Sequence, residues 1–376
     1  MKLSDKIESI EGSQTVAFTA LIQQLRQEGR EIIDLAVGEP QFDTPAPVIA
    51  ATKKALDDQM TRYGPVNGLA ELRTRLATQF SGYDTDNILI TNGSKQALYM
   101  IFQVICDPGD EVIIPMPFWV SFIEQVKLAG GRPVPVATRD HQLNCEAIAA
   151  AVTPQTRAIL INSPNNPSGA VYPMADLQKI AQLADDHNLF IIADEAYNAF
   201  VYDGSVHASM FEIETVRNRV IVTRSFSKSY SMTGFRIGYI AAPGEIIAAL
   251  SKIQSHLSGN VCTFAQYGAL AALSLDDRLL SARQSELQQK RDLAFQRVSK
   301  LFPCIKPRGA FYLFPDVSSA LKDNQTSEIL AARILKQAGV AVVPGEAFGM
   351  AKHMRISYAV SEENLKNGLD QIAEVL

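Results

Sequence analysis

The sequence has few cysteines and few histidines, and each scarcity excludes a class of protein. The four cysteines lie far apart and form no CxxC pair, which predicts reduced thiols in a cytoplasmic protein and no disulfide framework. The five histidines are scattered without an HExxH motif, so we predict no metal site. The cysteines are Cys106, Cys145, Cys262 and Cys304.

Long apolar runs and basic clusters are absent as well. The first ten residues contain no apolar core of a secretory signal, and polar side chains interrupt the longest uncharged stretch, 253–275. We therefore expect no membrane contact. The formal net charge is −5, from 35 basic and 40 acidic residues, and this balance argues against nucleic acid as a partner.

A chain of 376 residues is long enough for about two or three domains. Short apolar runs alternate with helical patterns such as 95–105 and 174–187, which is typical of an α/β fold with a mostly parallel sheet covered on both faces. The predicted strands are 88–91, 111–115, 158–162, 189–193 and 219–223.

The pattern changes after residue 275. A charged amphipathic helix is predicted over 276–301, and a terminal helix from Glu362. We expect an N-terminal segment (1–45) that packs with a small α+β domain (276–376), and a large domain between them (46–275). Short strands of the small domain are predicted at 310–314, 340–343 and 354–357.

Polar residues directly follow four of the predicted strands. Ligands of open parallel sheets bind beyond the carboxyl ends of the strands, so these residues are expected to meet at one edge. Taken singly, each group has a simpler interpretation, such as a helix cap at Ser94, a turn at 165–169 or a solvated lysine at Lys228. Their joint order and spacing favour a binding site.

The motifs resemble the class I pyridoxal-phosphate aminotransferases, and more narrowly their prokaryotic aspartate aminotransferase branch, over essentially the whole chain. This resemblance implies fold type I, with a seven-stranded, mostly parallel sheet between helices in the large domain. It also implies pyridoxal 5'-phosphate as cofactor and a homodimer. The motifs are AVGEPQFDTP (36–45), RYGPVNGLAELR (62–73), TNGSKQAL (91–98), DPGDEVIIPMPFWVSF (107–122), NSPNNPSGAVYP (162–173), ADEAYNAFVYDG (193–204), SFSKSYSMTGFRIGY (225–239), PRGAFYLF (307–314) and the pair VVPGEAFG and HMRISYA within 342–359.

The resemblance assigns the catalytic roles. Lys228 forms the Schiff base with the cofactor aldehyde and shuttles the α-proton, as a lysine amine can do. Asp194 keeps the pyridine nitrogen protonated, so that the ring acts as an electron sink. Asn166 and Tyr197 donate hydrogen bonds to the phenolic oxygen of the ring.

Further residues are expected to bind the phosphate and ring of the cofactor. Backbone N–H groups at a helix start and a guanidinium suit a phosphate dianion. Trp119 is expected to stack on the ring, and Tyr63 to reach the phosphate of the neighbouring subunit. The residues expected to bind the phosphate are Ser94, Lys95, Gln96, Ser225, Ser227 and Arg236.

The substrate residues implied by the resemblance begin with Arg355, a bidentate receptor for the α-carboxylate. Gly38, Trp119 and Asn166 complete this part of the site. Lys95 and Thr15 match positions near the distal carboxylate of acidic substrates.

One departure concerns substrate choice. Relatives that accept prephenate carry a basic residue a few positions before Thr15, whereas this chain has Glu11, which lowers the expectation for prephenate. Phe118 and Phe235 replace positions often held by Tyr and Trp, which favours apolar substrates. We predict ping-pong transamination between L-aspartate and 2-oxoglutarate, with aromatic or neutral amino acids (alanine-like or methionine-like) as the alternative.

Three other classes of protein fit the sequence less well. A nicotinamide enzyme would need a Gly-rich first turn, and the chain has no GxG. A pyridoxal-phosphate lyase of the same fold would also use Lys228 and Asp194, but Arg355 and the match over the whole chain favour an aminotransferase. A ligand-sensing regulator of transcription would carry a basic domain before this fold, and the match begins within about the first fifteen residues.

Overall fold

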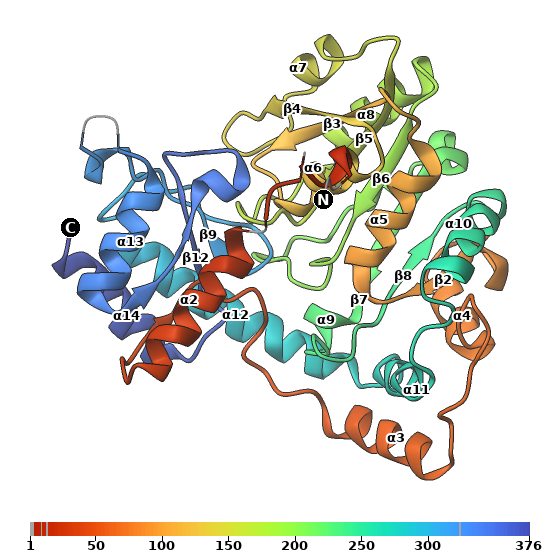
Figure 1. Ribbon diagram of the computed structural model, residues 1–376, viewed down its shortest axis with the longest axis horizontal. Coiled ribbons are helices and arrows are strands. Elements are labelled where there is room, and N and C mark those ends of the chain that lie inside the picture. The colour runs from red at the N-terminus through yellow and green to blue at the C-terminus, as the bar shows by residue number, and fades with distance from the viewer. Residues whose placement is uncertain (1–3, 9, 13, 323–324) are drawn as a thin grey trace.

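The computed structural model describes residues 4–8, 10–12, 14–322 and 325–376, and all their side chains except those of residues 5, 6 and 14–19. Its centre is a seven-stranded sheet with the order β2-β8-β7-β6-β5-β3-β4 (Figure 1). β8 runs antiparallel to both neighbours and every other pairing is parallel, so the predicted α/β fold with a mostly parallel sheet is confirmed. The strands are β2 (Ile88–Thr91), β3 (Glu111–Met116), β4 (Arg132–Ala137), β5 (Thr156–Asn162), β6 (Phe190–Asp194), β7 (Val220–Ser225) and β8 (Gly238–Ala241).

Two strands of this sheet were not predicted. β4 contains Pro133 and Pro135, which would interrupt a central strand, but β4 lies at the edge and needs hydrogen bonds on one side only. β8 begins with Gly238, inside the motif 225–239 that carries Arg236, so it does not stand out as a separate apolar run as β2 does.

Each face of the sheet carries its own apolar core. Neighbouring strand residues point to opposite faces, so Ile191 belongs to one cluster and Ile192 to the other. α3 (Ala46–Asp57), α4 (Ala70–Ala77), α7 (Cys145–Ala150), α8 (Met174–Asp186) and α11 (Thr263–Ala272) contribute to the first cluster. α5 (Gly93–Ile105), α6 (Ser121–Leu128) and α10 (Gly244–Leu257) cover the other face.

The C-terminal part surrounds a separate apolar cluster and a three-stranded antiparallel sheet, β11-β12-β9. Near the N-terminus, β1 (Ile33–Asp34) pairs in parallel with β10 (Val340–Ala341), and α2 (Gln14–Gln27) lies beside these C-terminal elements in Figure 1. The division at residues 45 and 275 stays a prediction. The other elements are α1 (Asp5–Glu8), α12 (Asp277–Val298), α13 (Ser327–Ala338), α14 (Glu362–Glu374), β9 (Tyr312–Leu313), β11 (Val343–Pro344) and β12 (Met354–Ser357).

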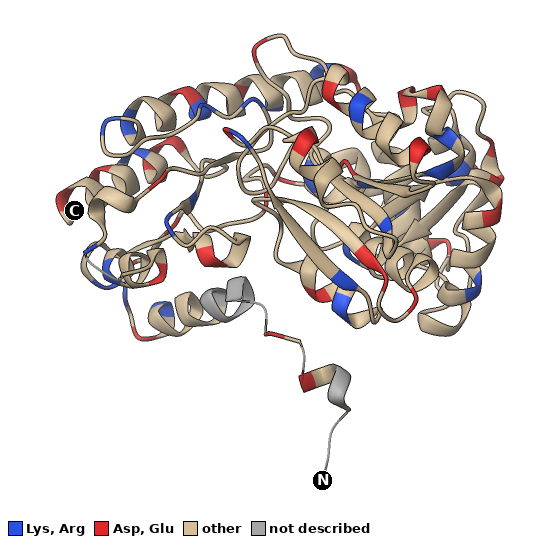
Figure 2. Ribbon diagram, turned by 90° about the horizontal axis from the view of Figure 1, so that it is seen from above, with Lys and Arg blue, Asp and Glu red and all other residues tan. Residues whose placement is uncertain are grey.

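The expectation of one strand over 340–343 was wrong, because this run is divided between β10 and β11 in two different sheets. Basic and acidic residues are interspersed along the described elements in Figure 2. No described helix is both long and apolar enough to cross a membrane.

Candidate active site

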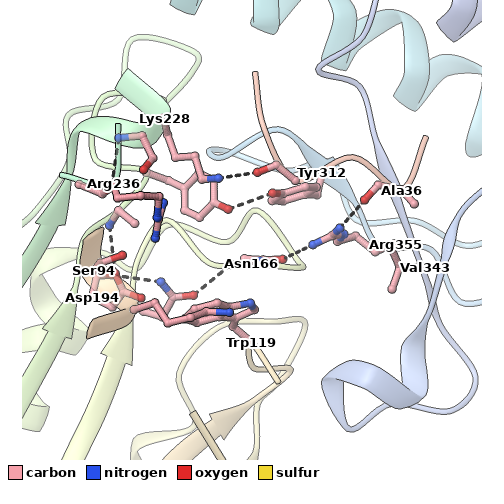
Figure 3. A pocket seen from close by; sticks show the side chains of 17 residues that line it. Ala36, Ser94, Trp119, Asn166, Asp194, Lys228, Arg236, Tyr312, Val343 and Arg355 are labelled. Atoms are coloured by element: carbon pink, nitrogen blue, oxygen red, sulfur yellow. Dashed lines mark hydrogen bonds between the residues drawn. The ribbon is translucent and has the colours of Figure 1, made fainter. Parts of the chain in front are cut away.

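A cavity of ≈ 360 Å³ lies at the carboxyl ends of the parallel strands, between the large sheet and the C-terminal elements (Figure 3). Most of the residues predicted for the site line it together. They are Gly38, Ser94, Lys95, Trp119, Asn166, Asp194, Tyr197, Ser225, Ser227, Lys228, Arg236 and Arg355.

Lys228 lies on the short helix α9 (Phe226–Ser229), which begins where β7 ends. Ser225 caps this helix, because its hydroxyl accepts a hydrogen bond from the N–H of Ser227 at 3.1 Å. Nζ of Lys228 donates to the carbonyl oxygen of Gly38 at 2.5 Å. Burial in the cavity, reinforced by the positive charges of Arg355 and other cations nearby, lowers the pKa of Lys228 to about 8.

Asp194 is the last residue of β6 and its side chain is buried. Its Oδ1 accepts hydrogen bonds from the N–H of Ala196 at 3.2 Å and from the hydroxyl of Thr223 at 3.3 Å. Neither donor carries a charge, so burial dominates and raises the pKa of Asp194 to about 7. A cationic hydrogen-bond donor beside this carboxylate would therefore stabilise its buried negative charge.

Arg355 enters the cavity from β12, opposite Asp194 (Figure 3). Its Nη1 donates to Oδ1 of Asn166 at 3.0 Å and its Nη2 to the carbonyl oxygen of Ala36 at 2.7 Å. The guanidinium also lies 4.3 Å from the ring centroid of Tyr312. All these partners are neutral and the buried Nε has none among the described residues, so the cation retains the capacity to bind a carboxylate.

Tyr197 and Tyr312 share a hydrogen bond of 2.9 Å between their hydroxyls. Both rings are buried, and burial raises the pKa of each hydroxyl above its usual value. Tyr197 therefore stays a neutral hydrogen-bond donor over the physiological pH range.

The start of α5 and Arg236 form a cradle for an anion. Gly93, the first residue of α5, has a φ of 75°, and a Cβ atom on it would lie 2.7 Å from Nη2 of Arg236. A Cβ atom on Gly238 would likewise lie 2.7 Å from the backbone N of Ser94. Two glycines thus bring a guanidinium close to the N–H groups of a helix N-terminus, which is an arrangement suited to phosphate.

Lys95 and Trp119 lie together in the cavity, with Nζ of Lys95 4.8 Å from the centroid of the indole ring. Burial, followed by the positive charge of Arg236, lowers the pKa of Lys95. Gln125 Nε2 holds the backbone carbonyl of Lys95 at 2.9 Å, which positions the first turn of α5 against α6.

Two predicted residues with described side chains, Gln96 and Tyr63, do not line the cavity. The side chain of Gln96 makes hydrogen bonds to other parts of the chain instead. Its Oε1 accepts from the N–H of Asn92 at 2.6 Å, and its Nε2 donates to Ser258 at 2.8 Å. Tyr63 is fully exposed. The side chain of Thr15 lies outside the described residues.

The prediction missed five residues that line the cavity. No local sequence pattern indicates that Tyr312 belongs to the site, although it lies in the recognised motif 307–314. Asn162 supports the site from within, since its Oδ1 accepts from the N–H of Asn166 at 3.0 Å. The missed residues are Ala36, Asn162, Ala196, Tyr312 and Val343.

The buried carboxylate of Asp194 matches a protonated ring nitrogen, and the cradle at Gly93 matches a phosphate. Lys228, with its lowered pKa, lies in the same cavity. These are the groups that pyridoxal phosphate requires. The fold and the cavity thus define the class of pyridoxal-phosphate enzymes built on a mostly parallel sheet.

Comparisons with known proteins narrow this class. The model of the family "aminotransferase class I and II" matches residues 30–372. An aspartate aminotransferase of Geobacillus stearothermophilus is 37% identical over 385 residues, 99% of this chain and 98% of the relative. A probable aspartate/prephenate aminotransferase of Aquifex aeolicus is 40% identical over 387 residues, 100% of this chain and 98% of the relative. The solved structure of Thermus thermophilus aspartate aminotransferase with maleate has a TM-score of 0.96 at 37% identity, with complete coverage of both chains.

The chain belongs to the class I and II aminotransferases, which depend on pyridoxal phosphate. The predicted family, cofactor and enzyme class are thereby confirmed.

Proposed function

We propose that this aminotransferase transfers the amino group of L-aspartate to 2-oxoglutarate by a ping-pong mechanism. The observation that carries the proposal is that Lys95 and Arg355 line one cavity in addition to Lys228 and Arg236, which are assigned to the cofactor. Aspartate, glutamate and their oxo acids each carry two carboxylates, and a second cation favours them over neutral side chains. The Thermus thermophilus relative was solved with maleate, which is also a dicarboxylate.

Four residues carry out the chemistry around the cofactor. Bound pyridoxal phosphate supplies an aldehyde that accepts the amino group and a ring that withdraws electrons. Lys228 would hold the cofactor covalently through Nζ and, as the free amine, would move the α-proton. In the chain alone, a pKa of about 8 leaves about a tenth of this amine neutral at pH 7. Asp194 holds the proton on the ring nitrogen. Asn166 and Tyr197 donate to the phenolic oxygen, since Oδ1 of Asn166 is already occupied by Arg355 and leaves the amide N–H₂ to donate.

The remaining residues bind and orient. Trp119 stacks on the ring, and Arg355 binds the α-carboxylate with the aid of Gly38 and Asn166. Lys95, together with Thr15, receives the distal carboxylate. The phosphate is held by Ser94, the N–H groups of Lys95 and Gln96, Ser225, Ser227 and Arg236.

A second copy of the chain completes the site. Tyr63 is fully exposed, and Ile49, Leu56 and Met60 are exposed apolar side chains of the same region, in and just after α3. A homodimer would cover these side chains and bring the hydroxyl of Tyr63 to the phosphate of its partner. We further propose that the enzyme works in the cytoplasm, with domains at 1–45, 46–275 and 276–376.

Prephenate is a second candidate substrate, because the Aquifex aeolicus relative is named for it. The negative charge of Glu11 would repel the carboxylates of prephenate, although the side chain of Glu11 is exposed and does not line the cavity. The backbone N–H of Glu11 donates to Oε2 of Glu124 at 3.0 Å, which holds this segment against α6.

Single half-reactions test the proposal. Amino acids are added one at a time to the purified holoenzyme without an oxo acid, and conversion of the cofactor to its pyridoxamine form is followed by absorbance. Rapid conversion by aspartate and glutamate is expected. Prephenate, an oxo acid, is tested in the reverse half-reaction by adding it to the pyridoxamine form. Conversion only by aromatic or neutral amino acids would refute the substrate assignment and leave the aminotransferase class intact.

A further inference from the structure

Directly behind Asp194 lies a second buried carboxylate that the proposed chemistry does not use. Glu195 follows Asp194 in the chain, and successive extended residues point to opposite sides, so Asp194 faces the cavity and Glu195 faces away from it. The side chains of both residues are almost completely buried, with relative exposures of 4% and 3%. A buried carboxylate next to a reacting site requires a physical reason.

Arg224 and Ser209 bond the carboxylate of Glu195, and His207 lies beside it. Its Oε2 lies 2.9 Å from Nε and 2.8 Å from Nη2 of Arg224, and 3.2 Å from Nε2 of His207. Its Oε1 accepts from the hydroxyl of Ser209 at 2.5 Å. Burial raises the pKa of Glu195, but Arg224, His207 and Ser209 outweigh it and lower the pKa to about 2. Glu195 is therefore an anion at every physiological pH.

Glu195 and Arg224 join β6 to β7 at the point where the backbone ladder between these strands ends. The last partners in that ladder are Asp194 and Thr223, and the N–H of Glu195 then donates to the carbonyl of Thr223 at 2.9 Å. Thr223 bonds Asp194 on the cavity side, and Arg224 bonds Glu195 on the far side. The next residue, Ser225, lines the cavity and caps the helix that carries Lys228.

We infer that Glu195 and Arg224 form a positioning pair, which fixes Asp194 relative to Ser225 and balances the buried charge behind the cofactor ring. The inference rests on the role proposed for Asp194. Beyond the last ladder pair, the backbone bond from Glu195 to Thr223 joins β6 to β7. The charge-assisted bond between Glu195 and Arg224 adds a link on the far face, which keeps the ring-nitrogen partner and the phosphate hydroxyl at a constant separation.

Two variants test the pair. Glu195→Gln leaves Arg224 buried without its anion, and is expected to weaken cofactor binding ~10-fold to 100-fold, as loss of the outer partner of a metal ligand weakens metal binding. It is also expected to move the pH midpoint of the bound cofactor's visible absorbance to lower pH, because loss of a buried negative charge disfavours protonated groups nearby. The double variant Glu195→Gln/Arg224→Met removes both charges, so its midpoint is expected to return towards that of the wild type while cofactor binding stays weak.

Asp203→Asn is the matched control. Arg291 is completely buried and bonds both carboxylate oxygens of Asp203 at 2.7 Å, away from the cavity. This variant is expected to lower the melting temperature of the protein without changing the cofactor's dissociation constant or its pH midpoint.

Two results would overturn the inference. One is a Glu195→Gln protein that loses thermal stability like the control but keeps the wild-type midpoint and affinity. The other is a double variant that binds the cofactor as tightly as the wild type. Because the double variant has no unpaired buried charge, it tests the positioning role even when Glu195→Gln does not fold. Wild-type holoenzyme without any pH-dependent band would instead refute the proposed roles of Lys228 and Asp194, and the positioning pair with them.

Discussion

Arg355 donates through Nη1 to Oδ1 of Asn166 at 3.0 Å, a bond between residues 189 positions apart in the chain. It joins β12 of the C-terminal part to the loop that follows β5 of the large sheet. Each residue orients the other: the guanidinium is turned towards the cavity, and the amide presents its N–H₂ group. The residue proposed for the substrate carboxylate and one proposed for the cofactor oxygen are thus a single unit.

Lys228→Ala is expected to lower steady-state turnover by at least about 10³-fold, because covalent attachment of the cofactor and proton transfer are lost together. The measurement is kcat with aspartate and 2-oxoglutarate. Lys252→Ala, on the exposed side of α10, serves as control and should retain wild-type activity. Substantial residual turnover of Lys228→Ala would contradict the assignment.

Lys95→Ala is expected to lower kcat/KM for aspartate about 10-fold to 100-fold, the value of one charge-assisted hydrogen bond. Phenylalanine and alanine, which have no distal carboxylate, should be affected much less. The kcat/KM series over these three amino acids measures the difference. Equal losses in all three would mean that Lys95 serves only the phosphate end of α5.

Asp194→Asn should make the apoprotein more stable above pH 7, although it weakens cofactor binding. Folding raises the pKa of Asp194 from its usual value to about 7, so ionisation of this buried group costs stability as pH rises from about 4 to 7. The asparagine removes this cost, which is of the order of 4 kcal/mol at most. Melting temperatures of both apoproteins between pH 4 and 8 should diverge with rising pH; parallel curves would refute the raised pKa.

Gly93→Ala is expected to impair cofactor binding because a Cβ atom there would displace Arg236. Gly82→Ala is a matched control, since Gly82 has a similar positive φ of 82° but no heavy atom of the described residues within 4 Å of the added Cβ. Both variants should lose about 1 kcal/mol of stability from backbone strain. Only Gly93→Ala should raise the cofactor's dissociation constant, measured by equilibrium dialysis, and an equal effect in both would contradict the cradle.

Tyr63→Phe is expected to weaken cofactor binding several-fold in the dimer, the effect of losing one hydrogen bond. Tyr83→Phe, whose hydroxyl lies 3.5 Å from the carbonyl of Arg217 and outside the cavity, is the control. Dilution of the wild type until dimers dissociate should lower cofactor affinity as well. A monomer that binds the cofactor as tightly as the dimer would refute the role of Tyr63.

Most of the large sheet could be predicted because its strands are buried on both faces and therefore read as continuous apolar runs. The failures have physical causes. Prolines at 133 and 135 hid an edge strand, and β8 begins with a glycine inside the motif 225–239, so it does not stand out as an apolar run of its own. In the C-terminal part, strands of two to four residues are set by tertiary pairing, which is why 340–343 was predicted as one strand rather than two.

The sequence by itself determined the family and the cofactor and indicated the candidate site residues, because turn glycines, strand-end polar groups and a lysine motif are local features that follow one another along the chain. Only the tertiary structure decided how they act. It shows that Asn166 is oriented by Arg355, that Tyr312 bonds Tyr197, and that Glu195 faces away from the cavity towards Arg224. Such pairs join residues far apart in sequence, and burial and charge at each atom depend on the whole packed environment rather than on neighbours in the chain.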